Sequence, residues 1–418
     1  MKIAMLHWGF PPIIGGVETH LIFLLPELVK MGHEVSLLTG SAEDSPDHFD
    51  FHGAKIVRSQ YFDLNWLVKS GFQEMDESVY KVIYKFLEDL KPDVIHAHNM
   101  HYFCRYHTRI VERYAIQNKI PLILTAHNTW TDKLFLDLTC DIYWDRIIAI
   151  SHYIERELMS VGVKKEKIDV IHHGIDSELF KPGEISKKLF KEHPQLKRKK
   201  KIVFNPARMG LAKGCDITIA AFRLVKNKFP DAFLLMSGSG NIIDWCLSQN
   251  KDIAYLMSMI KHLDLEGSIY VNTFSISEEM PDLYRLSDVI VYPSSTEEPF
   301  GLAMLEAMSS GKPIVVTNSG GMPEIIKDDI NGYVVPKRNH EELAERIIHL
   351  LSDDKFRKDL GDAGRKQVEE MYTKEIYASK ILNTYEEAIR NYSSKGKSAN
   401  KLIMKNKAPK SSRRNLQE

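Results

Sequence analysis

Short uninterrupted runs of apolar residues alternate along the first half of the chain with longer segments in which apolar residues recur at every third or fourth position. Uninterrupted runs are typical of strands buried on both faces of a parallel sheet, and the longer period is typical of the helices that cover it. We therefore expect helices over Val17–Met31 and Glu74–Leu90. The strands expected in this half are Ile3–Leu6, Val35–Thr39, Ala54–Arg58, Val94–Ala97, Leu122–Thr125, Ile147–Ile150 and Val170–Ile171.

The same alternation restarts after a basic linker, Lys181–Lys201, and predicts a second sheet. A helix is expected over Asp216–Phe229, and the pattern from Glu341 to Arg390 is helical throughout. The strands expected here are Ile202–Phe204, Phe233–Met236, Ile269–Val271, Val289–Tyr292 and Ile314–Thr317. The sequence thus predicts the α/β fold class, with two doubly wound Rossmann-like domains facing across a cleft. Ligands of such domains bind at the carboxyl ends of the strands, so the cleft is the expected site.

The composition is ordinary for a soluble globular protein and excludes few functions. The 418 residues are 44% hydrophobic and 27% charged, which is enough apolar material for two cores. The 56 basic and 56 acidic residues cancel, which argues against a dedicated nucleic-acid-binding protein. The segment Lys395–Glu418 is an exception, with eight basic residues and one acidic residue. We expect a disordered, solvated tail there, and a tether to an anionic membrane is the alternative.

The cysteines and the N-terminus predict a cytoplasmic location. Four scattered cysteines with no Cys-x-x-Cys pair indicate reduced thiols, not a disulfide framework or a zinc site. The apolar segment Met1–Leu6 is too short for a signal peptide, and no run approaches the ~18 apolar residues of a membrane span. A peripheral position at the inner face of the membrane is the alternative that the basic tail allows.

The segment Val289–Thr317 carries the most informative pattern, VIVYPSSTEEPFGLAMLEAMSSGKPIVVT. A strand is followed by a Ser/Thr-rich loop, and a helix is expected to begin after Glu298, with Pro299 in its first turn. The free N–H groups of Gly301 and Leu302 at this helix start would form an anion-binding site.

Two carboxylates of this segment, Glu298 and Glu306, are close enough along the chain to contact one ligand lying across the helix start. Each has a plainer alternative. Glu298 is also explained as a charge that stabilises a helix start. Glu306, between Leu305 and Ala307, is also explained as a hydrogen-bonded buried carboxylate.

A second loop, NPARMGLAKG at Asn205–Gly214, directly follows an expected strand. Arg208 and Lys213 place two cations beside glycines at the strand end. Arg offers a planar fork for phosphate oxygens and Lys a compact point charge. Solvated loop cations are the alternative, but beside an anion-binding helix start a phosphate clamp explains them better.

Glycine pairs and histidines complete the candidates. Gly15-Gly16 stands at a strand-to-helix turn and Ser237-Gly238 follows a strand of the second half, so backbone could approach a ligand closely at both. No G-x-G-x-x-G is present, so the dinucleotide-binding fingerprint is absent. A plain helix-start turn is the alternative explanation of Gly15-Gly16. Of the 17 histidines, we expect a hydrogen-bonding or core role for His96 and a ligand-facing position for His127. No His-Glu-x-x-His is present, and we do not expect a metal site.

Together these motifs resemble those of the retaining nucleotide-sugar glycosyltransferases of the GT-B fold, specifically glycosyltransferase family 4. The resemblance covers nearly the whole chain to about residue 390. Its strongest element is the pair Glu298 and Glu306, which have seven residues between them. Supporting elements are Gly15-Gly16, His127, Arg208 with Lys213-Gly214, and VIHHGID at Val170–Asp176. Two residues depart from the usual pattern: His173 stands where Asn is usual, and Asn128 where Asp is frequent.

The resemblance implies a hexosyltransferase that moves a sugar from a UDP- or GDP-sugar to a hydroxyl of a glycan, glycolipid or small-molecule acceptor, without metal or resident cofactor. Glu306 would bind the ribose and Glu298 the donor sugar, while Arg208 and Lys213 stabilise the leaving diphosphate. The implied catalytic residues are His127, Arg208, Lys213 and Glu298. The implied donor-binding residues are Gly15, Gly16, Arg208, Lys213, Gly238, Asn272, Thr273, Phe274, Glu298, Phe300, Gly301, Leu302 and Glu306.

The resemblance also assigns the segments of the chain. Residues 1–180 would bind the acceptor, residues 181–373 the nucleotide sugar, residues 374–391 would form a helix that crosses back to the first domain, and residues 392–418 the basic tail. Aromatic residues in first-domain loops suit an acceptor or simple core packing, among them Tyr61, Phe62, Trp66, Tyr102, Phe103, Trp130 and Trp144. The alternative functions are a catalytically silent nucleotide-sugar-binding subunit and a glycoside phosphorylase of similar fold.

Overall fold

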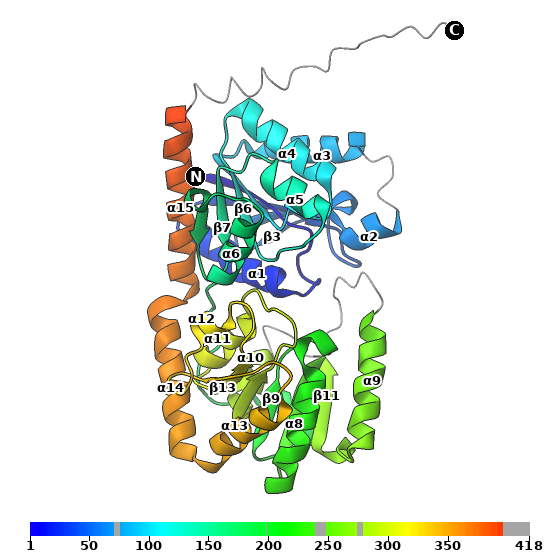
Figure 1. Cartoon of the computed structure of the whole chain (residues 1–418). Coiled ribbons are helices and arrows are strands. Elements are labelled where there is room, and N and C mark those ends of the chain that lie inside the picture. The colour runs from blue at the N-terminus through cyan, green and yellow to red at the C-terminus, as the bar shows by residue number, and fades with distance from the viewer. Residues whose placement is uncertain (71–75, 198, 239–247, 274–278, 396–418) are drawn as a thin grey trace, which may run out of the picture.

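The computed structural model describes residues 1–70, 76–197, 199–238, 248–273 and 279–395. Two sheets, each flanked by helices, form two halves that stand one above the other in Figure 1. The α/β class and the doubly wound arrangement expected from the sequence are confirmed.

The first sheet has eight strands in the order β3-β4-β2-β1-β5-β6-β7-β8. All neighbours are parallel except the edge pair β3 and β4. The strands are β1 (Lys2–Leu6), β2 (Glu34–Gly40), β3 (His48–Phe51), β4 (Ala54–Ser59), β5 (Val94–His98), β6 (Leu122–Ala126), β7 (Arg146–Ala149) and β8 (Ile168–Val170). Every residue of β5 and β6 is buried, as expected for strands covered on both faces.

The second sheet has six parallel strands in the order β11-β10-β9-β12-β13-β14. They are β9 (Ile202–Asn205), β10 (Phe233–Gly238), β11 (Ile269–Thr273), β12 (Val289–Tyr292), β13 (Ile314–Thr317) and β14 (Tyr333–Val335). The strand order reverses between β1 and β5 in the first sheet and between β9 and β12 in the second. Such switch points open a crevice at the carboxyl ends of the strands.

The helices of the first half are α1 (Gly16–Lys30), α2 (Leu64–Lys69), α3 (Asp76–Leu90), α4 (Arg105–Asn118), α5 (Lys133–Cys140) and α6 (His152–Ser160). Those that follow are α7 (Lys187–Glu192), α8 (Cys215–Lys228), α9 (Ser248–His262), α10 (Met280–Leu286), α11 (Leu302–Ser309), α12 (Met322–Ile325), α13 (His340–Ser352), α14 (Asp354–Met371) and α15 (Lys374–Lys395). Short 3-10 turns lie at Gln60–Phe62, Lys165–Lys167, Pro194–Leu196, Leu211–Lys213 and Glu266–Ser268.

The C-terminal helix runs alongside the first half, although the residues just before it belong to the second (Figure 1). Tyr377, Ile381 and Tyr385 of α15 share a core with Ile3 and Leu24. The prediction of unbroken helix from Glu341 to Arg390 is wrong at two places. Asp353 is extended, and its side chain accepts the Phe356 N–H at 2.9 Å to start α14.

The second break, at Tyr372 and Thr373, has a long-range cause. The Ile175 N–H donates to the Tyr372 carbonyl, and the Lys374 N–H donates to the Ile175 carbonyl, each at 2.9 Å. This pairing with the end of the first half takes the backbone out of the helix. The last helix also continues to Lys395, four residues past its expected end, and residues 396–418 of the expected tail lie outside the described residues.

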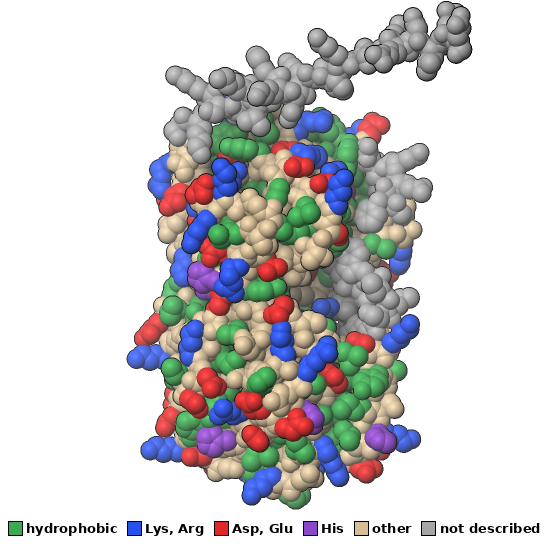
Figure 2. Space-filling view, in the orientation of Figure 1, with side chains coloured by type: hydrophobic (Ala, Val, Ile, Leu, Met, Phe, Trp, Pro, Cys, Tyr) green, Lys and Arg blue, Asp and Glu red, His purple; other side chains and the backbone are tan. Residues whose placement is uncertain are grey.

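Among the described residues, no helix combines the length and apolar character that crossing a bilayer requires. Acidic and basic side chains are interspersed over the face shown in Figure 2, so that face carries no broad patch of one charge.

Candidate active site

A cavity of about 430 Å³ lies between the two halves, at the carboxyl ends of both sheets. Both halves contribute residues that directly follow strands. The sequence-predicted residues that line it are Gly15, Gly16, His127, Arg208, Lys213, Glu298, Phe300, Gly301, Leu302 and Glu306. The structure therefore brings together, in one place, four motifs that are far apart along the chain.

Contacts between the halves help to form this cavity. The Glu324 carboxylate on α12 accepts the N–H groups of His152 and Tyr153 at the start of α6, both at 2.7 Å. The Ser151 hydroxyl donates to the carbonyl of Pro299 at 2.7 Å. The predicted place of Pro299 in the first turn of a helix is wrong, because α11 begins only at Leu302, after the backbone reverses at Gly301.

The N-termini of two helices, one from each half, border the cavity. Gly15 precedes α1, and a Cβ on it would lie 2.3 Å from Oε2 of Glu18. A Cβ on Gly16 would meet no atom within 4 Å, so the space beside it is open. On the opposite side Gly301 has a φ of +87°, which favours glycine, and the first-turn N–H groups of Leu302 and Ala303 follow it. Both helix ends present partial positive charge to one cavity.

Lys213 and Glu298 form an ion pair in the cavity wall. The Lys213 Nζ donates to Glu298 Oε2 at 2.5 Å, and the Tyr292 hydroxyl donates to the same oxygen at 2.9 Å. Burial alone would lower the pKa of Lys213, but the neighbouring Tyr292 and Glu298 outweigh it and raise that pKa, so Lys213 is a fixed cation. The loop is held by Gly214, whose φ is +69° and where a Cβ would lie 1.8 Å from the Pro293 carbonyl oxygen.

Glu306 is buried at the second turn of α11 and has one strong partner. The Tyr284 hydroxyl on α10 donates to Glu306 Oε2 at 2.6 Å. Burial raises the pKa of Glu306 to about 7, and the hydrogen bond from Tyr284 opposes that shift only in part. This carboxylate can therefore accept hydrogen bonds from a ligand and titrates near neutral pH.

Arg208 is exposed at the cavity wall, three residues after the end of the buried strand β9. Its loop is fixed by Asn205, whose Oδ1 accepts the Ala207 N–H at 3.0 Å and whose Nδ2 donates to Thr218 Oγ1 at 2.7 Å. The exposed guanidinium can turn toward an anion in the cavity without breaking the loop.

The first half contributes buried histidines. His127 and His173 line the cavity, and the His127 N–H donates to Asn99 Oδ1 at 2.9 Å. The expected role of His96 in hydrogen bonding is confirmed, because its ring nitrogens bond to the hydroxyls of Tyr385 and Thr125, each at 2.6 Å.

Part of the predicted donor-binding set is not among the described residues that line the cavity. Asn272 and Thr273 end the edge strand β11, and Asn272 pairs in register with Ser237, which does line it. Asn272 therefore lies one strand further out, where its amide donates to the Tyr270 hydroxyl at 3.0 Å. Gly238 directly follows Ser237 but does not itself appear in the described lining, and Phe274 lies outside the described residues.

Sequence reasoning missed the hydroxyl partners of both glutamates. Tyr292 is the last residue of β12, so the strand-end rule that found Lys213 would also have found it. Tyr284 is 22 residues before Glu306 on another helix, and no sequence signal links the two. Glu18 was also missed: it lines the cavity and lies 3.0 Å from His7 Nε2, both residues being buried.

Two family models and a full-length relative match this chain. The family model described as Glycosyltransferase Family 4 matches residues 14–179, and the model described as Glycosyl transferases group 1 matches residues 186–367. An uncharacterized glycosyltransferase of Methanocaldococcus jannaschii is 28% identical over 93% of this chain and 99% of its own length.

Two solved structures share the fold. Sucrose-phosphate synthase from Thermosynechococcus elongatus superposes with a TM-score of 0.78 at 20% identity, covering 93% of this chain and 99% of that chain. The structure of Anabaena HepE in complex with UDP and glucose has a TM-score of 0.73, also at 20% identity, and covers 93% of this chain and 100% of that chain. At these identities the likeness establishes the architecture of two facing Rossmann-like halves.

Proposed function

This chain belongs to the GT-B glycosyltransferases of the family 4 type, and on that premise we propose that the cavity between its halves binds a nucleoside diphosphate sugar and transfers the sugar, with retention, to an acceptor hydroxyl. The observation that carries the proposal is the convergence of Arg208, Lys213 and two helix N-termini on one cavity. The UDP complex of the HepE neighbour supports a nucleotide-sugar donor.

The chemistry explains why positive groups gather here. When the bond between sugar and phosphate breaks, the leaving diphosphate gains negative charge while the sugar becomes oxocarbenium-like. Fixed donors aimed at that developing charge are usually the largest catalytic contribution, about 10²–10³ in rate for one donor. Lys213, Arg208 and the N–H groups of Leu302 and Ala303 would supply this field, so we propose that the diphosphate needs no metal.

The two glutamates would position the donor. Glu306 would accept hydrogen bonds from the ribose hydroxyls, and Glu298 would contact hydroxyls of the transferred sugar while it orients Lys213. His127, on the wall of the first half, would lie beside the reacting carbon. Retention is inherited from the family resemblance: the acceptor would attack on the face that the diphosphate leaves, and a phosphate oxygen would take the acceptor proton.

The acceptor would meet the first half. Trp130 and Tyr102 stack there with ring centroids 4.1 Å apart and an interplanar angle of 5°, which suits a flat sugar or lipid contact. Phe62 and Trp144 are 0% and 1% exposed, so core packing explains these two aromatic residues. The described free thiols, Cys104, Cys140 and Cys215, support the expected cytoplasmic location.

A ligand panel tests this function. Thermal denaturation is recorded with UDP, GDP and ADP and with their sugars, with and without EDTA. One nucleotide should raise the melting temperature in proportion to its affinity, and EDTA should leave that rise unchanged. Incubation with the matching sugar donor and an acceptor should then give a product whose anomeric configuration, read by NMR, equals that of the donor. No stabilisation by any nucleotide, or an inverted product, would contradict the proposal.

A further inference from the structure

Six histidines are buried together in the first half, beside the cavity: His7, His20, His96, His98, His127 and His173. They come from the ends of several strands and from α1. The rings of His20 and His173 lie 4.5 Å apart, and those of His20 and His127 lie 5.2 Å apart, measured between centroids. Of these six histidines, only His127 has a role in the transfer reaction proposed above.

The hydrogen bonds within this cluster leave some ring nitrogens without a partner. His20 Nε2 bonds to the Tyr377 hydroxyl at 2.7 Å, and His127 bonds through Nε2 to His98 at 3.0 Å and through Nδ1 to His173 at 3.3 Å. Within the described chain, His98 Nε2 and His173 Nδ1 are buried without a partner, whereas the His20 ring, beyond its contact with Tyr377, also interacts with the Val17 backbone. A buried polar atom without a partner costs about 1–3 kcal/mol, so the unpartnered nitrogens on His98 and His173 point to a ligand among these rings.

Protonation of these rings does not supply the missing hydrogen-bond partners. Burial, with a smaller contribution from His7, lowers the pKa of His20 to about 3. Burial and the neighbouring histidines also hold the pKa values of His98 and His127 well below the ordinary value.

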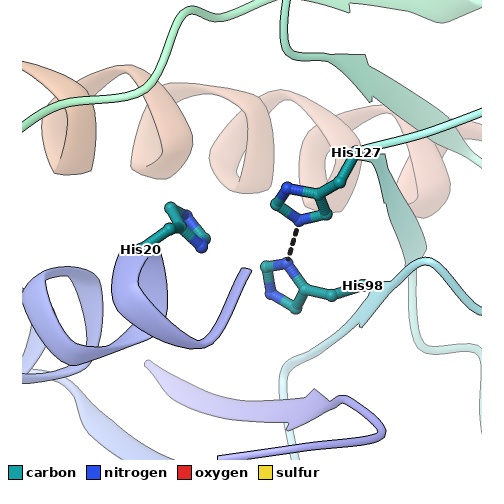
Figure 3. A group of neighbouring side chains, drawn as sticks. All are labelled: His20, His98 and His127. Atoms are coloured by element: carbon teal, nitrogen blue, oxygen red, sulfur yellow. Dashed lines mark hydrogen bonds between the residues drawn. The ribbon is translucent and has the colours of Figure 1, made fainter. Parts of the chain in front are cut away.

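We propose that His20, His98 and His127 form a binding site for a divalent transition metal such as Zn²⁺. Each offers one ring nitrogen, and the three nitrogens lie within 4.8 Å of one another. Figure 3 shows His20, on α1, facing the hydrogen-bonded pair of His98 and His127. Nitrogens bound to one tetrahedral Zn²⁺ at ~2.0–2.1 Å lie about 3.4 Å apart, so modest ring rotations would close the site.

The surroundings fit such a site. The contact from His20 to Tyr377, and that from His127 to His173, fix the second ring nitrogen, as outer hydrogen bonds do for most metal-ligating histidines. The ion would link α1, β5 and the loop after β6. Three protein ligands leave one coordination position for a water or ligand, and because His127 lines the cavity, the ion has a route in. Diphosphate binding by Arg208 and Lys213 does not depend on this ion, but with the ion bound His127 would border the reacting carbon without a free ring nitrogen.

The test uses the full chain, stripped of metal by a chelator and then dialysed. Zn²⁺ is titrated by calorimetry and Co²⁺ by visible absorption. We expect one equivalent per chain, intense Co²⁺ bands of low coordination number, and a melting temperature that rises with Zn²⁺ without any nucleotide. If wild-type protein binds no Zn²⁺, or if bound Co²⁺ gives only the weak bands of an octahedral oxygen site, the proposal is overturned and water fills the cluster.

Substitutions then locate the site. His20→Gln and His98→Gln should each weaken Zn²⁺ binding by at least tenfold. The matched control is His96→Gln, which removes a buried histidine of the same cluster whose nitrogens already bond to Tyr385 and Thr125, and it should bind Zn²⁺ as the wild type does. An equal loss of Zn²⁺ binding in all three variants, or full Zn²⁺ binding by His20→Gln, would overturn the assignment. If a variant does not fold, the Co²⁺ spectrum of the wild-type protein decides between the two outcomes.

Discussion

Replacing Lys213 with methionine removes one cation from the cavity wall and keeps most of the side-chain volume. The side chains have similar length, so packing is largely kept while Nζ is lost. In the native protein Nζ donates to Glu298 Oε2 at 2.5 Å, and after the change the Tyr292 hydroxyl is the one side-chain donor to that carboxylate left among the described residues. Lys213→Met therefore perturbs both the fold and the proposed diphosphate contact, and the two effects can be measured separately.

The expected loss of stability follows from how exposed the ion pair is, and the expected loss of rate follows from the contact with the leaving group. The side chains of Lys213 and Glu298 are 25% and 10% exposed. Exposed pairs contribute at most ~1 kcal/mol, and loss of one partner of a fully buried pair costs ~3–5 kcal/mol, so a partly buried pair should lose about 2 kcal/mol of unfolding free energy. Loss of one preorganised donor to the leaving group should lower kcat by about 10²–10³.

The assay follows release of the nucleoside diphosphate under saturating donor, with unfolding measured in urea on the same samples. The matched control is Lys337→Met, which breaks the neighbouring ion pair between Lys337 and Glu297, away from the described cavity lining. It should lose no more than ~1 kcal/mol of stability and should keep its rate. A Lys213→Met enzyme that turns over within threefold of the wild-type rate, or a Lys337→Met enzyme that is equally slow, would refute the reasoning.

Three further changes probe other parts of the site. Burial raises the pKa of Glu306 from 4.5 to about 7, so the wild-type protein should lose stability relative to Glu306→Gln as the pH rises from 4.5 through 7. The loss of unfolding free energy, measured in urea, should be at most about 3 kcal/mol. A stability difference that does not change with pH would contradict this prediction. Gly214→Ala should cost roughly 2–4 kcal/mol, seen in thermal melts, because of its positive φ and the close Pro293 carbonyl; an unchanged melting temperature would argue against that strain. Gly16→Ala should keep the melting temperature, because a methyl group there meets no protein atom within 4 Å, yet it should raise the KM for the donor, because it borders the cavity. An unchanged KM would indicate that the donor does not bind beside Gly16.

The sequence predicted the parts of the fold that depend on local pattern. Apolar runs located the buried strands, and polar residues after them located Arg208, Lys213 and Glu298, because parallel strands bring their carboxyl ends to one edge. Short edge strands such as β3 and β14 were missed, since β3 has no buried residue to give an apolar run and β14 has only three residues.

Long-range contacts explain what the sequence could not predict. The break before α15 arises from backbone pairing with Ile175, which no helical pattern records. The raised pKa of Glu306 depends on how deeply α11 is packed, and the histidine cluster gathers residues from positions 7 to 173 with no common spacing. Asn272 was expected to follow a strand, but β11 continues through Thr273 and lies at the edge of the sheet, so Asn272 is not part of the described lining.

A crystal structure of the protein soaked with the nucleotide sugar that stabilises it most tests the central claim directly. We expect the diphosphate between the two halves, with its oxygens within hydrogen-bond distance of Lys213 Nζ and of the first-turn N–H groups of α11. A diphosphate bound on the outer surface of either half, with Lys213 still paired only to Glu298, would contradict the proposed reaction.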